Sequence, residues 1–335
     1  MIDVNGSGEG GQLTILQAIN KALGDAMSED GRVFVLGEDV ADLEGGGVVG
    51  VTSGLSSRFG EDRVRSTPIS EQAIMGAAIG ASIAGYRPVP EIMLMNFTTV
   101  AMDMIVNHAA KLRFMSGGQT HVPITIRTMT GAGYGTGGQH SDYLEAWFAH
   151  TPGIKVVAPS MPADAYGLLR SCIEDEDPCL FIENITLYGK IGPGCTSDHR
   201  VPIGKARMVA EGSDLSLVTY ARMTYESQAA LELLRKEGIS VDLIDLRSVA
   251  PWDKSTVLDS VAKTGRALIV HEAVTEFGVG AEITAVIAQE HFGRLKAPVM
   301  RMGAVRAPVP VSKPLESAHS PNAERIAAKI RELLG

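Results

Sequence analysis

Residues 154–183 read IKVVAPSMPADAYGLLRSCIEDEDPCLFIE, and this stretch contains the pattern from which the fold class follows. A short apolar run, Ile154–Ala158, is followed by the helical segment Pro162–Ile173 and by a second apolar run, Cys179–Glu183. Buried strands joined by a crossover helix lie parallel in one sheet. The stretch therefore predicts an α/β fold, with a mostly parallel sheet covered by helices on both faces.

The same alternation of helix and strand extends upstream. Thr14 and Gln17 have the spacing of a capping box, which predicts a helix that ends near Gly31. The run Val33–Leu36 then reads as a buried strand, and a further helix is expected over residues 98–115. These elements extend the predicted α/β domain toward the N-terminus.

A stretch without periodicity interrupts this alternation in the second half of the chain. Residues 188–204 contain four glycines and two prolines, a composition typical of a linker. Beyond it, the alternation restarts with strands predicted near residues 215–220, 241–246 and 267–271. A length of 335 residues also suggests roughly two domains. We therefore expect a tail at 1–12, a first α/β domain at 13–188, a linker at 189–204 and a second, smaller α/β domain at 205–335.

The composition excludes several classes of protein. With 30 Lys and Arg against 39 Asp and Glu and no dense basic run, a surface for nucleic acid or an anionic membrane is not expected. No apolar run approaches the roughly 20 residues that cross a bilayer, and the first residues do not resemble a secretion signal. The three cysteines, Cys172, Cys179 and Cys195, form no CxxC pair, which favours reduced thiols and a cytoplasmic location.

A glycine-rich loop at residues 131–141 carries one candidate for chemistry. Its segment Gly133–Gly138 formally matches GxGxxG. A dinucleotide fingerprint, however, opens a helix at the first strand-to-helix turn, whereas this loop comes late and leads to Gln139-His140-Ser141. A nicotinamide-dependent oxidoreductase is therefore kept only as an alternative. His140 either holds the loop through backbone hydrogen bonds or performs acid/base work near pH 7.

Glu71 is the second candidate. It follows Ser70, a plausible N-cap, at the start of a predicted helix of small apolar residues that runs to about Ala84. The carboxylate therefore lies at the positive end of a helix dipole. It is either an ordinary first-turn carboxylate or a buried group that shares a proton with a ligand nitrogen, its pKa raised by desolvation.

Several separate motifs, in this order, resemble the β subunit of thiamine-diphosphate-dependent E1 components of 2-oxo acid dehydrogenase complexes. The motifs are Gly37–Val40, Thr67–Glu71, Asn107–Lys111, Ser116–Gln119, Gln139–Ser141, Pro152–Val157 and Ile244–Arg247. The resemblance covers about residues 13–330. It implies a pyrimidine-binding, transketolase-like domain followed by a transketolase C-terminal-like domain.

The resemblance also implies roles for individual residues. It makes Glu71 the catalytic carboxylate that hydrogen-bonds N1′ of the cofactor's aminopyrimidine and so promotes loss of the C2 proton. It makes His140 the catalytic histidine that contacts the substrate and assists acyl transfer to a lipoyl group. The residues that it places around thiamine diphosphate, with Phe97 against the pyrimidine, are Glu38, Ile69, Ser70, Glu71, Met93 and Phe97.

A monovalent-cation loop is implied as well. Residues 172–178, together with Ile124, resemble a loop that binds potassium mainly through carbonyl oxygens. The implied ligands are Ile124, Cys172, Ile173, Asp175 and Asp177. Asp177 departs from the family pattern, which has Asn at this position.

Finally, the resemblance implies partners. The chain has no Gly-Asp-Gly segment followed by Asn that could hold magnesium and a diphosphate, and in this family the separate α subunit holds both. An α2β2 heterotetramer is implied, which docks on a lipoyl-bearing E2 acyltransferase and meets E3 only through the complex. A non-catalytic scaffold subunit is the other alternative function.

The substrate stays open between a 2-oxo acid and acetoin. Residues 171–179 resemble the branched-chain enzymes, whereas residues 46–55, 126–133 and 218–223 look more like acetoin dehydrogenases. Pyruvate is the third candidate, since the α subunit of this family can supply much of the surface around the substrate.

Overall fold

The computed structural model describes residues 11–335, so the tail predicted at residues 1–12 lies almost wholly outside the described residues. The chain divides into two compact units. The first comprises the chain up to Thr130 together with Trp147–Ile203, and the second comprises Gly131–Ala146 together with Gly204–Gly335. Residues 131–146, which the sequence-based boundaries assign to the first domain, thus group with the second unit.

The first unit is built on a parallel sheet. Its strands are neighbours in the order β6 (Lys155–Val157), β7 (Cys179–Asn184), β5 (Thr125–Thr130), β4 (Arg87–Leu94), β2 (Val33–Gly37) and β3 (Val64–Ser66). The helix α6 (Pro162–Glu174) joins β6 to β7, so the predicted strand–helix–strand unit is confirmed. Every residue of β5 and β7 is buried, as expected for strands covered on both faces.

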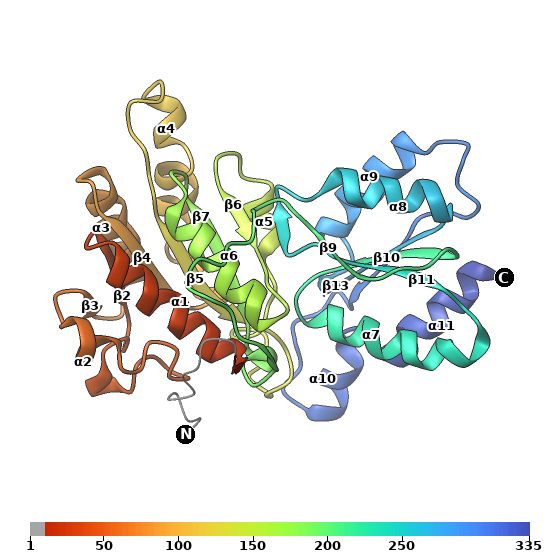
Figure 1. Cartoon of the computed structure of the whole chain (residues 1–335), viewed down its shortest axis with the longest axis horizontal. Helices are drawn as coiled ribbons and strands as arrows, with labels where there is room; N and C mark the ends of the chain where they lie inside the picture. The colour runs from red at the N-terminus through yellow and green to blue at the C-terminus, as the bar shows by residue number, and fades with distance from the viewer. Residues whose placement is uncertain (1–10) are drawn as a thin grey trace. The chain divides into compact units, whose positions relative to one another are not determined.

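Helices and turns surround this sheet. The helix α1 (Ile15–Glu29) begins at the predicted capping box, where the Thr14 amide donates to Gln17 Oε1 at 2.9 Å and the Gln17 amide donates to Thr14 Oγ1 at 3.1 Å. Figure 1 shows α1 beside α6, and the two helices are in contact. The remaining elements of this unit are β1 (Gln12–Thr14), η1 (Asp42–Glu44), α2 (Leu55–Phe59), α3 (Glu71–Ile83), η4 (Ile185–Leu187) and β8 (Ile191–Pro193).

The single helix predicted over residues 98–115 is wrong. The chain instead forms a 3₁₀ turn, η2 (Met95–Thr99), a π-helical segment, η3 (Met104–Ala109), and a short helix, α4 (Leu112–Met115). A Cβ on Gly153 would lie 1.9 Å from the carbonyl oxygen of Ala110, so a distant segment packs directly against the backbone between the last two pieces. Such close packing is a property of the tertiary structure, which helical periodicity does not report.

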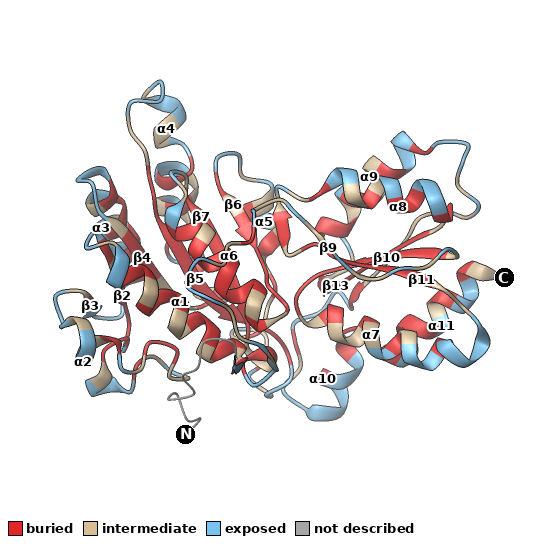
Figure 2. Ribbon diagram, viewed as in Figure 1, coloured by how far each residue is buried: buried red, intermediate tan, exposed pale blue. Residues whose placement is uncertain are grey.

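The second unit has its own sheet. Its order is β14 (Met300–Ala304), β13 (Ala267–Val274), β10 (Leu215–Thr219), β11 (Val241–Asp245) and β9 (Arg207–Ala210), parallel except for β9. Figure 1 shows α8 (Lys254–Thr264) and α9 (Val279–Glu290) on one face, and α7 (Arg222–Leu234) and α11 (Ala323–Leu334) on the other. Buried residues line both sheets (Figure 2). The other elements are α5 (Glu145–Ala149), η5 (Arg235–Glu237), β12 (Ser248–Ala250) and α10 (Lys313–His319).

Candidate active site

Two carboxyl groups lie together at the carboxyl end of β2. Glu38 directly follows this strand and Glu71 is the first residue of α3, and both are buried, with 5% and 7% of their surface exposed. The Ser70 amide donates a hydrogen bond to the Glu38 carboxylate. Burial raises the pKa of Glu38, and the nearby charge of Glu71 raises it further. Glu38 is therefore harder to ionise than an exposed glutamate, because it is buried beside a second carboxyl group.

The helix start at Glu71 differs in one respect from the expectation. Ser70 occupies the N-cap position, but its side chain makes no capping hydrogen bond. Glu71 lies in the first turn of α3, where the positive end of the helix dipole stabilises a carboxylate. Glu38 Oε1 is buried and has no hydrogen-bond partner. A buried oxygen of this kind is costly unless a ligand donates to it, so the pair suits a ligand that carries N–H groups.

The other residues expected around thiamine diphosphate come from three segments. Ile69 and Ser70 are exposed beside the start of α3, and Ile69 has 84% of its surface accessible. Met93 lies on β4 and Phe97 in η2, and both are half-buried. An exposed isoleucine next to two buried carboxyl groups offers apolar surface to a ligand ring. Their contact with the cofactor remains a prediction.

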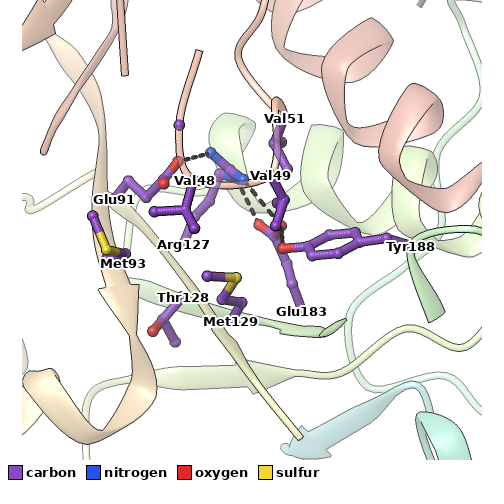
Figure 3. Close-up of a pocket in the computed structure, with 11 residues that line it drawn as sticks. Val48, Val49, Val51, Glu91, Met93, Arg127, Thr128, Met129, Glu183 and Tyr188 are labelled. Atoms are coloured by element: carbon purple, nitrogen blue, oxygen red, sulfur yellow. Dashed lines mark hydrogen bonds and ion pairs between the residues drawn. The ribbon is translucent and has the colours of Figure 1, made fainter. Parts of the chain in front are cut away.

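A buried ion cluster, which sequence reasoning missed, lies across β4, β5 and β7 (Figure 3). Arg127 is 2% exposed, and its Nη1 donates to Glu91 Oε2 at 2.6 Å. Its Nε and Nη2 donate to the two carboxylate oxygens of Glu183 at 2.7 and 3.0 Å, a bidentate pair. Tyr188 Oη donates to the same carboxylate at 2.7 Å. Charged residues within otherwise apolar strands were the available signal.

The four residues of this cluster line a small cavity, together with Met93. The other apolar side chains that line it, all labelled in Figure 3, are Val48, Val49, Val51 and Met129. Burial alone would lower the pKa of Arg127, but the carboxylates of Glu183 and Glu91 raise it above its usual value. The guanidinium is therefore charged and links side chains of the adjacent strands β4, β5 and β7.

We expect Arg127→Met to reduce the unfolding free energy of the chain by about 3–5 kcal/mol, because it leaves buried carboxylates without their counter-charge. Denaturant unfolding measures the change. Arg113→Met is the matched control: Arg113 pairs with Asp177 at 2.6 Å, but both side chains are partly exposed and water screens them. Equal losses for the two variants would contradict a structural role for the buried cluster.

The glycine-rich loop and His140 belong to the second unit. His140 is half-buried, and its backbone amide donates to the carbonyl oxygen of Gly137 at 3.1 Å. The Gly133 amide donates to Glu316 Oε1 at 2.6 Å, and the Gly135 amide donates to the same oxygen at 3.1 Å. A carboxylate of the same chain thus occupies the loop amides that a dinucleotide phosphate would need, and the nicotinamide-dependent alternative is not favoured.

A second buried polar group in this unit was also missed. Tyr220 Oη donates to Glu145 Oε1 at 2.6 Å, and burial raises the pKa of Glu145 to about 7. His271 stacks on Tyr220 at 6.4 Å between ring centroids, and burial lowers its pKa to about 4, so its ring is neutral. Cβ atoms on Gly278, Gly280 and Gly303 would come within 2.9 Å of the His271 ring. Glycines are required there to close the backbone around this side chain.

The residues expected to bind potassium lie in the last turn of α6 and in the segment between α6 and β7, with Ile124 just before β5. Its residues are Ile124, Cys172, Ile173, Asp175 and Asp177. Arg87 Nη1 donates to the carbonyl oxygens of Ile173 and Asp175, at 3.0 Å each. The Asp175 carboxylate pairs with Lys155 Nζ at 2.5 Å. Cationic side chains of this chain therefore already contact several of the oxygens.

Two further observations concern the described residues as a whole. Among residues 11–335, no group of three or more His, Cys, Asp or Glu side chains is arranged to hold a metal ion. No helix in that range has both the length and the apolar character needed to cross a bilayer.

Comparison with known proteins points to one family. Residues 11–190 match the transketolase pyrimidine-binding domain, and residues 204–326 match the transketolase C-terminal domain. The β subunit of acetoin:2,6-dichlorophenolindophenol oxidoreductase from Cupriavidus necator is 43% identical, over 96% of this chain and 98% of that one. The pyruvate dehydrogenase E1 β subunit of Staphylococcus aureus is 42% identical, over 96% and 99%.

Solved structures agree on the fold. A structure described as a split-gene transketolase, inactive β4 tetramer, superimposes with a TM-score of 0.79 and covers 97% of this chain and 99% of its own. At 22% identity this similarity concerns the fold alone. It agrees with the predicted order of a pyrimidine-binding domain and a transketolase C-terminal-like domain.

Proposed function

Because this chain belongs to the E1 β subunits of pyruvate and acetoin dehydrogenases, we propose that it supplies half of a thiamine-diphosphate-dependent active site, which an α subunit completes. The observation that carries the proposal is the buried pair of Glu38 and Glu71 at the carboxyl end of β2. In open parallel sheets, ligands bind at this edge.

The residues of this pair fit the aminopyrimidine of the cofactor. Glu38 has a buried oxygen without a hydrogen-bond partner, and burial together with the charge of Glu71 raises its pKa. Glu71 holds the ring nitrogen and controls its proton, while Glu38 accepts from or donates to the same ligand. When bound, thiamine diphosphate supplies an electron sink for cleavage of the bond next to the substrate carbonyl. Ile69, Ser70, Met93 and Phe97 complete the contacts of this chain.

His140 acts in the second half of the reaction in this proposal. An imidazole can donate and accept the proton that moves when an acyl group passes to a lipoyl sulfur. The Glu316 carboxylate of the same unit accepts hydrogen bonds from two amides of the loop that carries His140. Glu71 and His140 are the two residues of this chain to which we assign catalysis.

The partners of the chain are part of the proposal. Because the relatives are named as β subunits, we propose that an α subunit completes the site and binds magnesium and the diphosphate. An α2β2 assembly that docks on a lipoyl-bearing E2, with E3 reached only through the complex, is part of the proposal. Three free thiols, at Cys172, Cys179 and Cys195, support a cytoplasmic location.

Potassium remains a proposal too. The carbonyl oxygens of Ile173 and Asp175 accept from Arg87, and a carbonyl oxygen has a second lone pair with which it can contact a cation. No chemical step is assigned to this ion.

Reconstitution tests the function. We expect the chain mixed with its α subunit, thiamine diphosphate and magnesium to turn over pyruvate, a branched-chain 2-oxo acid or acetoin, and to transfer the acyl group to a lipoyl domain. Neither subunit alone should be active, because each holds part of the site. The ratio of kcat/KM among the three substrates identifies the natural one. Activity of the α subunit without this chain would contradict the proposal in favour of a non-catalytic scaffold.

A further inference from the structure

The loop that carries His140 has a backbone conformation that requires glycine at several positions. Gly131, Gly133, Gly135 and Gly137 all have positive φ, between 68° and 138°. Glycine adopts such angles without strain, but it also leaves the free backbone with many other conformations. A loop of this composition therefore needs contacts from outside itself to hold a catalytic side chain in one place.

Glu316 supplies such contacts at the middle of the loop. It lies in α10, some 180 residues away in the sequence, and only 5% of it is exposed. Its Oε1 accepts from the Gly133 amide at 2.6 Å and from the Gly135 amide at 3.1 Å, and its Oε2 accepts from Gly135 at 3.2 Å. Hydrogen bonds to a carboxylate are stronger than those between neutral groups, especially when buried.

The two ends of the loop segment are held separately. At the first end, the Ala132 amide donates to Glu272 Oε1 at 2.9 Å, and Arg222 Nη1 donates to the Ala132 carbonyl at 2.9 Å. At the second end, Glu145 accepts from Tyr220 at 2.6 Å. His140 lies in the sequence between these two sets of contacts. The Glu316 carboxylate binds the backbone between Ala132 and the histidine.

Close packing continues from the Glu316 contacts to the residues just before His140. A Cβ on Gly137 would lie 2.9 Å from Val311, and one on Gly138 would lie 3.0 Å from Pro308. Val311 and Pro308 belong to the segment that leads into α10. The segment that presents Glu316 therefore also supports the backbone of the loop up to the residue that precedes Gln139-His140.

We propose that Glu316 is a positioning residue for His140: its carboxylate binds the loop amides as an internal anion and sets the place of the imidazole during acyl transfer. This inference rests on the proposed function, because it acts through His140. Misplacing a reacting group by about 1 Å can cost up to about a hundredfold in rate. Glu316 touches neither substrate nor cofactor in this proposal.

The test uses Glu316→Gln in the reconstituted α/β enzyme. The amide keeps the size of the side chain but removes the charge that binds the two glycine amides. We expect acyl transfer to a lipoyl domain to fall about tenfold, as a loss of kcat, while decarboxylation measured with an artificial electron acceptor changes less than about twofold. Glu324→Gln, an exposed glutamate in the first turn of α11, is the matched control and should retain full acyl transfer.

A double-mutant cycle separates positioning from a merely structural role. Because Glu316 acts through His140, Glu316→Gln should cost nothing further in an enzyme that already carries His140→Ala. An equal loss in both backgrounds, or no loss in either, would overturn the proposal. Glu316→Asp retains the charge and replaces the glutamine variant in the cycle if that variant does not fold. Absence of thiamine-dependent turnover in the unmodified enzyme would instead count against the proposed function.

Discussion

Replacing Glu71 with glutamine is expected to lower turnover of the reconstituted α/β enzyme by at least about a hundredfold. The carboxylate is 7% exposed and lies beside Glu38, whose pKa is raised by burial and by the charge of Glu71. Glutamine has nearly the same shape but cannot exchange a proton with a ring nitrogen. The loss should therefore appear in activation of the cofactor, with assembly of the two subunits unchanged.

Two measurements check this expectation. Exchange of the cofactor C2 proton for deuterium, followed by magnetic resonance after acid quench, reports activation directly, and gel filtration reports assembly. Glu61→Gln is the control, since Glu61 is an exposed glutamate of the same unit. Turnover and exchange equal to the unmodified enzyme would remove Glu71 from the catalytic role, and loss of assembly would reassign it to the subunit interface.

The second large effect is expected for His140→Ala. We expect acyl transfer to the lipoyl domain to fall by about 10²–10⁴, the usual contribution of a general acid or base. Cofactor affinity and C2 exchange should change little, because they depend on Glu38 and Glu71 of the other unit. Stopped-flow measurement of single-turnover reductive acylation separates this step from decarboxylation.

The control for His140→Ala is His150→Ala, an exposed histidine close by in the sequence. Its loss should leave acyl transfer within about twofold, as for surface positions away from a site. Equal acylation rates for the His140 variant and the unmodified enzyme would contradict the assignment. A parallel loss of C2 exchange would place His140 in cofactor activation instead.

Local patterns were sufficient for much of the fold. The apolar runs on either side of residues 162–173 predicted two parallel strands and their helix, because burial on both faces leaves a continuous apolar stretch. The capping box at Thr14 predicted the start of α1, because both partners lie within one turn. The prediction of one helix over residues 98–115 was wrong. The backbone of Gly153 packs against Ala110, and a contact between segments so far apart in the sequence does not change the helical pattern of apolar residues.

The sequence by itself determined the alternation of strands and helices, the family motifs and the candidates Glu71 and His140, because each depends on residues that are close in the chain. Only the tertiary structure decided which charges are buried together. Arg127 and Glu183 are 56 residues apart, and Gly133 and Glu316 are 183 apart. Such pairs depend on strand register and on the packing of α10, and burial of the Glu316 carboxylate strengthens its contacts with the loop amides.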